Sequence, residues 1–310
     1  MTSGPTGAGS ARDDAGRRAL LVVNADDYGL TEGVSTAILH AHRDGIVTST
    51  SVLALAPGFA PSVGWLADAP ELGTGAHLAA VGEDPPLLSA KEVPTLVDGR
   101  GRLWSSWRVF LPRAAAGRID PDDLKREFGA QIEAIAGAGV DIDHLDTHQN
   151  LHLWPMVADV VLDLGEAHDV RTVRVTRSTG KGPVGLTVRR LATRLEGELR
   201  RRGWRWPEAS TGLDEAGALE LGAMVTALDR LAATGARSAE LATHPGGADD
   251  GDRDRYRWSY RWEDEYAALR SATVRTAVDE LGFRLGTFAD LGDADLGDVD
   301  LGDVEREEPA

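Results

Sequence analysis

Short apolar runs alternate with amphipathic helical runs along most of this 310-residue chain, and this alternation constrains the fold more than any other feature. Residues 19–24 predict a buried strand, residues 31–45 a helix that Thr31 caps, and residues 46–55 a second strand. About seven or eight such units follow one another, which is typical of a parallel sheet wrapped by helices. We therefore predict a single-domain α/β fold, an irregular TIM-like (β/α) barrel, with an open doubly wound sheet as the alternative.

The helix that starts at Pro121 is the best marked in the sequence. Asp120 is suited to cap it, and acidic residues follow at its positive end. Residues 85–107 have no clear period and predict a long loop. Further strands are expected at residues 74–78, 140–145, 173–175, 238–243 and 283–288, and further helices from residue 155 and at residues 186–202, 221–235 and 263–281.

The composition restricts both partners and chemistry. A net charge of −17 disfavours binding to nucleic acids and to anionic membranes. Because cysteine is absent, any metal must be held by histidine, carboxylate or water. No apolar run approaches the roughly 18 residues that a membrane span needs, so we expect a soluble, cytoplasmic protein. The oligomeric state stays open, with a homodimer as one alternative.

The two ends of the chain differ from the middle. Residues 1–18 are rich in Gly, Ser, Ala and charge, and predict a disordered leader. Residues 292–310 predict an acidic disordered tail, which repeats the string LGD followed by small and acidic residues. Residues 19–291 are left as the folded domain.

Four polar clusters each follow a predicted strand. They are the string NADD at residues 24–27, His77, the string DTH at residues 146–148, and the string HPG at residues 244–246. In barrel enzymes, residues at the carboxyl ends of the strands converge on one active site. We therefore expect these clusters to meet.

Asp26 and Asp27 are adjacent carboxylates at the end of a buried strand. Such a pair is unfavourable unless a cation or a proton offsets its repulsion. A metal ion solves the problem, because one carboxylate can bind it while the other takes a proton from water. The alternative is that both residues only cap the next helix.

His77 and His148, with one aspartate, form a two-histidine, one-carboxylate set that leaves positions for water and substrate. His152 lies four residues after His148 and is either a further ligand or a residue that supports the ligands. His244 lies in a His-Pro-Gly turn, which directs its ring toward the mouth of the barrel.

These motifs resemble those of the YdjC-like family of carbohydrate deacetylases, which includes chitooligosaccharide deacetylases and hopanoid-associated relatives. The matching strings run in the family's order across residues 19–291. They are LVVNADDYG at 21–29, GIVTSTS at 45–51, GAHL at 75–78, DTHQNLHLWP at 146–155 and HPG at 244–246.

The resemblance implies a hydrolase that removes an N-acetyl group from an amino sugar, an oligosaccharide or a glycolipid. It implies one divalent ion, Mg²⁺ or Zn²⁺, bound by Asp27, His77 and His148. By the same analogy Asp26 is the general base and His244 the general acid. The implied partner is an N-acetylated carbohydrate.

One position departs from the family pattern. Asn150 stands where the family usually has a second histidine of a His-x-His-x-His run. Since the first histidine of that run is the expected ligand, metal binding should persist and substrate preference should change. Asn150, His152 and Arg174 are the candidate substrate contacts. Six tryptophans in loops or at helix ends are suited equally to stacking on sugars and to packing at the barrel rim: Trp104, Trp107, Trp204, Trp206, Trp258 and Trp262.

Two other functions compete. A phosphate-receiver module also binds Mg²⁺ with an acid pair after its first strand, but it needs an aspartate and a lysine where this chain has histidines. A non-catalytic sugar-binding protein on the same scaffold is the second rival, and the intact Asp26 argues against it. A metal-dependent deacetylase fits the residues best.

Overall fold

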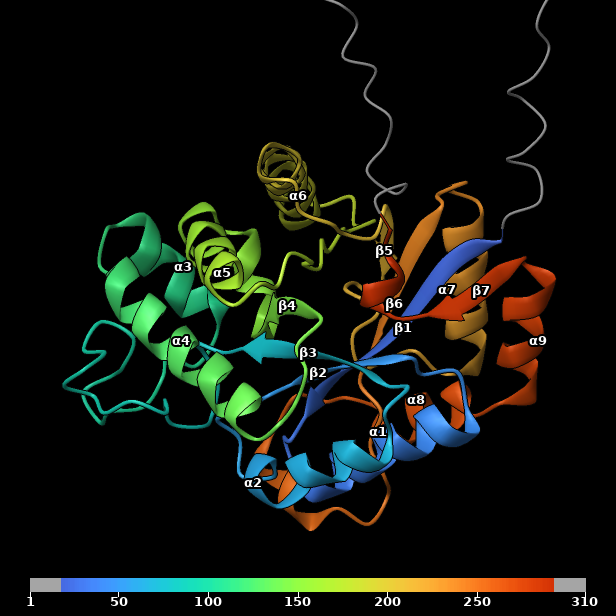
Figure 1. The fold of residues 1–310 in the computed structure, drawn as a ribbon, viewed down its shortest axis with the longest axis horizontal. Coiled ribbons are helices and arrows are strands. Elements are labelled where there is room, and N and C mark those ends of the chain that lie inside the picture. Colours follow the sequence, from blue (N-terminus) through green and yellow to red (C-terminus); the bar gives the residue numbers. More distant parts are fainter. Residues whose placement is uncertain (1–17, 293–310) are drawn as a thin grey trace, which may run out of the picture.

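A computed structural model describes residues 18–292 (Figure 1). The predicted leader at residues 1–18 and the predicted tail at residues 292–310 lie outside the described residues, except for Arg18 and Gly292. Both predictions therefore stay predictions.

Seven strands form one sheet in which every pair is parallel. The strand order is β4-β3-β2-β1-β6-β5, and β7 also pairs with β1. The central strand β1 is buried along almost its whole length, as its apolar start requires in a sheet covered on both faces. The strands are β1 Ala19–Tyr28, β2 Ser49–Val52, β3 Gly73–Leu78, β4 His144–Thr147, β5 Ala209–Thr211, β6 Ser238–Thr243 and β7 Phe283–Gly286.

The sheet curls into an incomplete barrel. Beyond β4, single parallel bridges join Leu145 to Val173 and Thr172 to Arg205, and β5 begins four residues after Arg205. These bridges lead from β4, at one end of the strand order, toward β5, at the other end. The predicted irregular TIM-like fold is thus confirmed, but the strand expected at residues 173–175 is reduced to isolated bridges.

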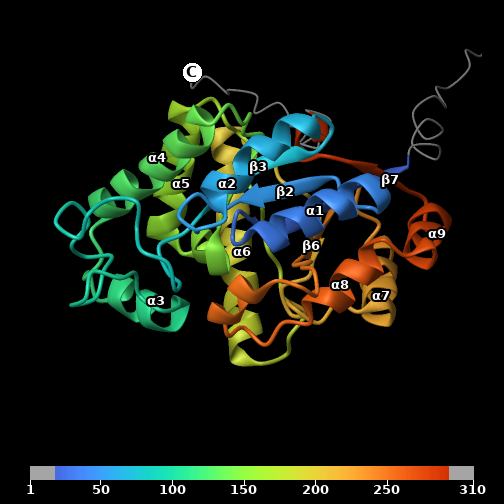
Figure 2. The same ribbon diagram turned by 90° about the horizontal axis from the view of Figure 1, so that it is seen from below.

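Helices surround the sheet (Figures 1 and 2). Helices α4 (Pro121–Gly137) and α5 (Pro155–Ala167) pack beside β3 and β4, and α1 (Glu32–Asp44) packs along β1. The other α-helices are α2 Phe59–Ser62, α3 Trp107–Ala115, α6 Pro183–Arg202, α7 Leu221–Ala232, α8 Trp262–Leu269 and α9 Ala272–Glu280. Short 3₁₀ helices are η2 Val63–Asp68, η3 His148–Leu153, η4 Gly251–Arg255 and η5 Phe288–Asp290.

The predicted helix ends are largely confirmed. The Thr31 side chain accepts a hydrogen bond from the Val34 amide at the start of α1, and Asp120 caps α4 in the same way. The single helix expected at residues 263–281 is wrong, because Ser271 caps a new helix, α9, two residues after α8 ends. Helix α3 and strand β5 were not predicted from the sequence.

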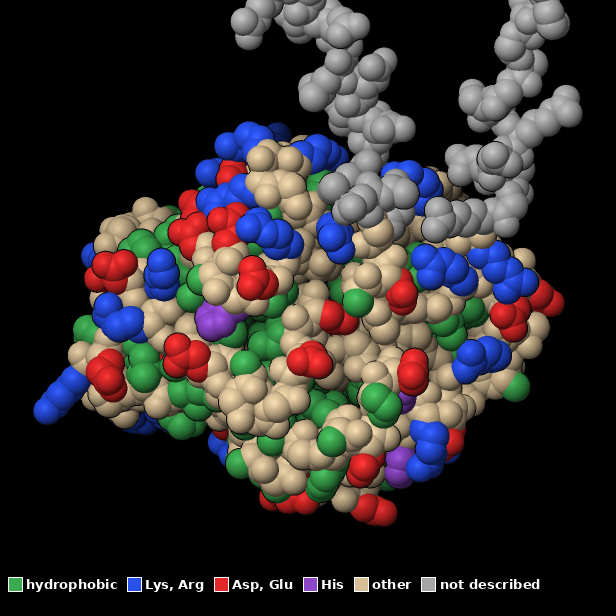
Figure 3. All heavy atoms as spheres, in the orientation of Figure 1, with side chains coloured by type: hydrophobic (Ala, Val, Ile, Leu, Met, Phe, Trp, Pro, Cys, Tyr) green, Lys and Arg blue, Asp and Glu red, His purple; other side chains and the backbone are tan. Residues whose placement is uncertain are grey.

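The outer surface carries the charge. Lys and Arg side chains gather along the upper edge of Figure 3, over α6. Arg202 of this helix pairs with Glu198 and with Asp163 of α5, so part of the positive charge is offset locally. Among residues 18–292, no helix combines the length and the apolarity needed to cross a membrane.

Candidate metal centre and active site

Strand β1 does not end at Asn24 but continues through both aspartates. In a regular strand, neighbouring side chains point to opposite faces, so only one of Asp26 and Asp27 would reach a given site. Here the register with β2 shifts between Ala25 and Tyr28, and Asp27 adopts a left-handed φ of 70°. This irregularity lets both carboxylates reach the same site.

Asp27, His77 and His148 come together at the carboxyl ends of β1, β3 and β4, and all three are buried. Asp27 Oδ1 lies 3.5 Å from His77 Nε2 and 3.4 Å from His148 Nδ1, and the two ring nitrogens are 3.3 Å apart. Ligand atoms bound at about 2.0–2.2 Å around a tetrahedral ion lie about 3.3–3.6 Å from one another. The spacing of these three atoms therefore fits a divalent cation.

The hydrogen bonding of Asp27 supports the same interpretation. Its Oδ1 atom is buried and accepts no hydrogen bond from any described residue. Burial alone would raise the pKa of Asp27, but the neighbouring His148 and His77 lower it to about 2. An ionised oxygen without a hydrogen bond, facing two imidazoles, is the donor set that a metal ion would complete.

Asp146 orients His77 from behind. Its Oδ1 lies 2.7 Å from His77 Nδ1, which leaves Nε2 free to face Asp27. Burial alone would lower the pKa of His77, but the charge and hydrogen bond of Asp146 raise it to about 9. Asp146 belongs to the DTH cluster predicted from the sequence, but no role was predicted for it. Its position two residues before His148 is the only feature of the sequence that points to it.

Asp26 lies beside this group and contacts different partners. Arg174 Nη1 and Nη2 donate to its two oxygens at 2.8 and 2.6 Å, and Asn24 Nδ2 donates to Oδ1 at 2.7 Å. Burial alone would raise the pKa of Asp26, but Arg174, together with the nearby His77 and His244, lowers it. Asp26, His77 and Asp146 form a second cluster with metal-ligand spacing, yet Arg174 already contacts both of its carboxylates, so the Asp27 cluster suits a cation better.

His244 follows β6 and faces Asp26, with Nε2 3.6 Å from Oδ2. Its amide donates to Glu265 Oε2 at 2.7 Å, so α8 anchors the His-Pro-Gly turn. The ring lies edge-on to Tyr260, with centroids 4.9 Å apart. Its Nδ1 atom is buried and finds no hydrogen-bond partner in the part of the chain described. Nothing in the sequence singles out Glu265, because it lies inside an ordinary amphipathic helix.

Arg174 differs from its predicted role. Only 2% of its side chain is exposed, and it contacts Asp26, Asp146 at 2.9 Å and Glu240 at 2.5 Å. A guanidinium enclosed by three carboxylates is poorly placed to contact a substrate. Its position favours a supporting role behind Asp26, with Glu240 as a partner that the sequence did not suggest.

The other two expected substrate contacts lie on η3. Gln149 and Asn150 have left-handed φ values of 56° and 54°, and Asn150 Oδ1 accepts a hydrogen bond from Thr176 at 2.5 Å. His152 Nδ1 lies 2.8 Å from Thr147 Oγ1, and burial lowers the pKa of His152 to about 4. His152 is in neither metal-spaced cluster found among the described residues.

Aromatic side chains line the site on one side. Trp258 lies against His148, with ring centroids 5.2 Å apart. Every second residue from position 256 to the start of α8 is aromatic, and these rings contact one another: Tyr256, Trp258, Tyr260 and Trp262. Trp258 is therefore the loop tryptophan that reaches the candidate ligands.

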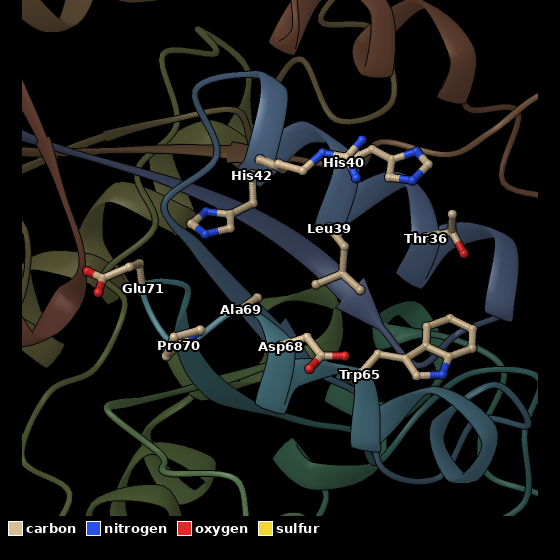
Figure 4. Close-up of a pocket in the computed structure, with 10 residues that line it drawn as sticks. Thr36, Leu39, His40, His42, Trp65, Asp68, Ala69, Pro70 and Glu71 are labelled. Carbon is tan, nitrogen blue, oxygen red and sulfur yellow. The ribbon is translucent and has the colours of Figure 1, made fainter.

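A hollow of about 570 Å³ lies elsewhere, between α1 and η2 (Figure 4). Its histidines, His40 and His42, come from the C-terminal half of α1. Their Nδ1 atoms lie 3.3 Å from the Tyr266 hydroxyl and 2.9 Å from the Val47 carbonyl oxygen. This hollow does not include the residues at the strand ends.

Comparison with known proteins agrees with the motifs. The model of the family described as YdjC-like protein matches residues 20–280. A carbohydrate deacetylase of Brevibacillus brevis is 35% identical over 150 residues, which cover 48% of this chain and 57% of that protein. The match spans 57% to 61% of the first three curated relatives.

Two comparisons extend over most of the chain. A chitooligosaccharide deacetylase of Proteus mirabilis is 27% identical over 273 residues, which cover 88% of this chain and 98% of that protein. A crystal structure from Enterococcus faecalis, described as a candidate cellobiose-phosphate cleavage protein, has a TM-score of 0.74 and 25% identity, covering 89% of this chain and 99% of that one. The chain belongs to the YdjC-like protein family.

Proposed function

We propose that this protein is a divalent-metal-dependent hydrolase that removes N-acetyl groups from an amino sugar, an oligosaccharide or a glycolipid. One observation carries the proposal: the rings of His77 and His148 converge on Asp27 Oδ1, an oxygen that forms no hydrogen bond. Asp26 and His244 lie directly beside this group. The substrate class is supported by the names of the relatives from Brevibacillus brevis and Proteus mirabilis.

In this proposal the cation is held by Asp27 Oδ1, His77 Nε2 and His148 Nδ1. When bound, it would polarise the acetyl carbonyl and lower the pKa of a water molecule. Two imidazoles and one carboxylate suit Zn²⁺ better than Mg²⁺, which prefers oxygen ligands. Asp146 serves the same site by fixing the His77 ring.

Asp26 and His244 would divide the proton transfers between them. Asp26 Oδ2 accepts a proton from the water molecule whose oxygen attacks the acetyl carbon. Arg174 keeps this carboxylate ionised and fixed in position. His244 Nε2 gives a proton to the sugar nitrogen as the C–N bond breaks, so the products are acetate and the free amine.

The test is acetate release by the purified protein, loaded with Zn²⁺ or Mg²⁺, on a panel of N-acetylated sugars, chitooligosaccharides and glycolipids. Asp26→Asn should lower kcat/KM by about 10²–10⁴-fold, because it removes the base and keeps the shape of the side chain. A chelator should abolish the activity. Acetate release that is unchanged by Asp26→Asn, or that persists after the metal is removed, would disprove this mechanism.

A further inference from the structure

A second cavity lies against the segment that follows the candidate ligand His148. It has a volume of about 520 Å³ and lies against η3, between α3 and the first half of α6. Its walls are mainly aliphatic and aromatic, and they include Trp107, Leu111, Leu153, Trp154, Val188 and Leu191. The volume is within the range of about 300–1,000 Å³ that small-molecule sites occupy.

Two segments of the chain lead from the candidate active site to the wall of the cavity. Gln149 and Asn150, which follow His148 directly, both line it. Along the neighbouring segment, Arg174 contacts Asp26, Thr176 contacts Asn150, and Ser178 lines the cavity. In an extended segment, every second residue lies about 7 Å further along the chain. Ser178, at the cavity wall, therefore lies within about 13 Å of Arg174, the partner of Asp26.

Polar atoms in the cavity wall are mostly occupied by contacts within the protein. The Asp214 carboxylate accepts hydrogen bonds from the Ser178 hydroxyl at 2.7 Å and from the Thr179 amide at 2.6 Å. Gln149 Oε1 accepts one from the Trp107 amide at 2.9 Å. Few groups are left to bind sugar hydroxyls, and Val184, which lines this cavity, is 59% exposed. An apolar occupant therefore fits the wall better than a sugar ring.

We propose that this cavity binds an apolar group carried by the substrate, attached to the amino sugar at a point away from the acetamide. The substrate class is then an N-acetylated glycolipid or another glycoside with a long alkyl group. This inference rests on the proposed deacetylase activity. The cavity takes the alkyl chain while Asp26 and His244 act on the acetamide.

The first experiment compares methyl and n-octyl N-acetyl-β-D-glucosaminide, each below its critical micelle concentration, as substrates of the metal-loaded protein. Wild type should deacetylate the octyl compound with a kcat/KM at least about tenfold higher, because apolar surface is buried only in that complex. Val184→Asp should remove most of this advantage and leave the methyl compound unaffected. The acid suits the first turn of α6, so the fold should persist.

Leu221→Asp is the matched control. Leu221 is 43% exposed, and it occupies the first turn of α7, outside the cavity. This variant should keep the full advantage of the octyl compound. Equal kcat/KM values for the two compounds in wild type, or an octyl advantage that survives Val184→Asp, would overturn the proposal.

Direct binding separates this proposal from the deacetylase activity. Trp107 and Trp154 line the cavity, so the octyl compound should change tryptophan fluorescence saturably in wild type and Leu221→Asp, and at least about tenfold more weakly in Val184→Asp. Such binding without acetate release would support the proposed apolar cavity and disprove the proposed deacetylase activity. Octyl and methyl compounds that bind with equal affinity would overturn the cavity proposal even if acetate is released.

Discussion

Both carboxylate oxygens of Asp26 accept hydrogen bonds from the single guanidinium of Arg174, at 2.8 and 2.6 Å. The same guanidinium lies 2.9 Å from Asp146, which in turn orients His77. One buried cation therefore supports both the candidate base and a candidate metal ligand. We therefore expect Arg174 to position both residues, and not to contact the substrate as the sequence had suggested.

Arg174→Gln should destabilise the protein strongly. The variant leaves Asp26, Asp146 and Glu240 buried without their cation, and breaking a buried ion pair costs about 3–5 kcal/mol. Urea unfolding would measure the loss. Arg177→Gln is the control, since its contact with Glu196 is partly exposed and should contribute less than about 1 kcal/mol. A loss no larger for Arg174→Gln than for Arg177→Gln would contradict this role.

Glu240 should make stability depend on pH. Burial, together with the nearby charges of Asp26 and Asp146, raises its pKa from 4.5 to about 7 despite the contact with Arg174. Between these values the folded protein keeps the Glu240 proton that the unfolded chain releases. The folded state binds more protons, so the free energy of unfolding falls as the pH rises through this window.

Glu240→Gln tests this dependence because it removes the titration and keeps the shape. Relative to the variant, wild type should lose at most about 3 kcal/mol of stability between pH 5 and pH 8. Urea midpoints of both proteins at the two pH values give the difference. If the stability difference between wild type and Glu240→Gln is the same at both pH values, or shifts in favour of wild type at pH 8, Glu240 stays ionised beside Arg174.

The sequence predicts the parts of this molecule that depend on local pattern. The caps at Thr31 and Asp120, the run of strand β6, and the positions of Asp27, His77 and His148 at the carboxyl ends of strands all follow from residue order. Parallel strands bring their carboxyl ends to one edge, so the meeting of these clusters was predictable as well.

What the sequence does not predict depends on contacts between distant segments. Glu240 lies in the middle of a buried strand and meets Arg174 only because the sheet curls, and Glu265 reaches the His244 amide from α8. The positive φ of Asp27 is a further example, since the pattern of a regular strand sends adjacent side chains to opposite faces. No local periodicity carries this information.

Asp146→Asn should weaken metal binding without removing a ligand. The amide no longer holds the His77 ring with the strength of a carboxylate, and loss of such a partner typically lowers affinity about 10- to 100-fold. Competition of Zn²⁺ against a fluorescent chelator measures the effect. Asp143→Asn is the matched control, because Asp143 contacts His144, at 2.5 Å, and does not contact His77. Equal affinity losses in the two variants would exclude a specific role for Asp146.

The last prediction separates the roles of His244 and Asp26 through the leaving group. An amine cannot leave an amide as an anion, so the C–N bond breaks only if a proton reaches the nitrogen, whereas the phenolate of p-nitrophenyl acetate leaves without one. His244 Nε2 lies 3.6 Å from Asp26 Oδ2 and is thus positioned at the same reaction centre as the base. His244→Ala should lower kcat/KM by about 10²–10⁴-fold for the N-acetylated sugar and by less than about tenfold for the activated ester.

Asp26→Asn provides the contrast, because both substrates need an activated water and both should lose rate to a similar degree. Tyr260→Phe is a further control, since it keeps the ring that packs on His244 and removes only the hydroxyl. Metal affinity measured in parallel should be unchanged in His244→Ala. If His244→Ala loses amide and ester hydrolysis in equal proportion, His244 does not protonate the leaving amine, and its ring instead positions Asp26 or binds the carbonyl oxygen.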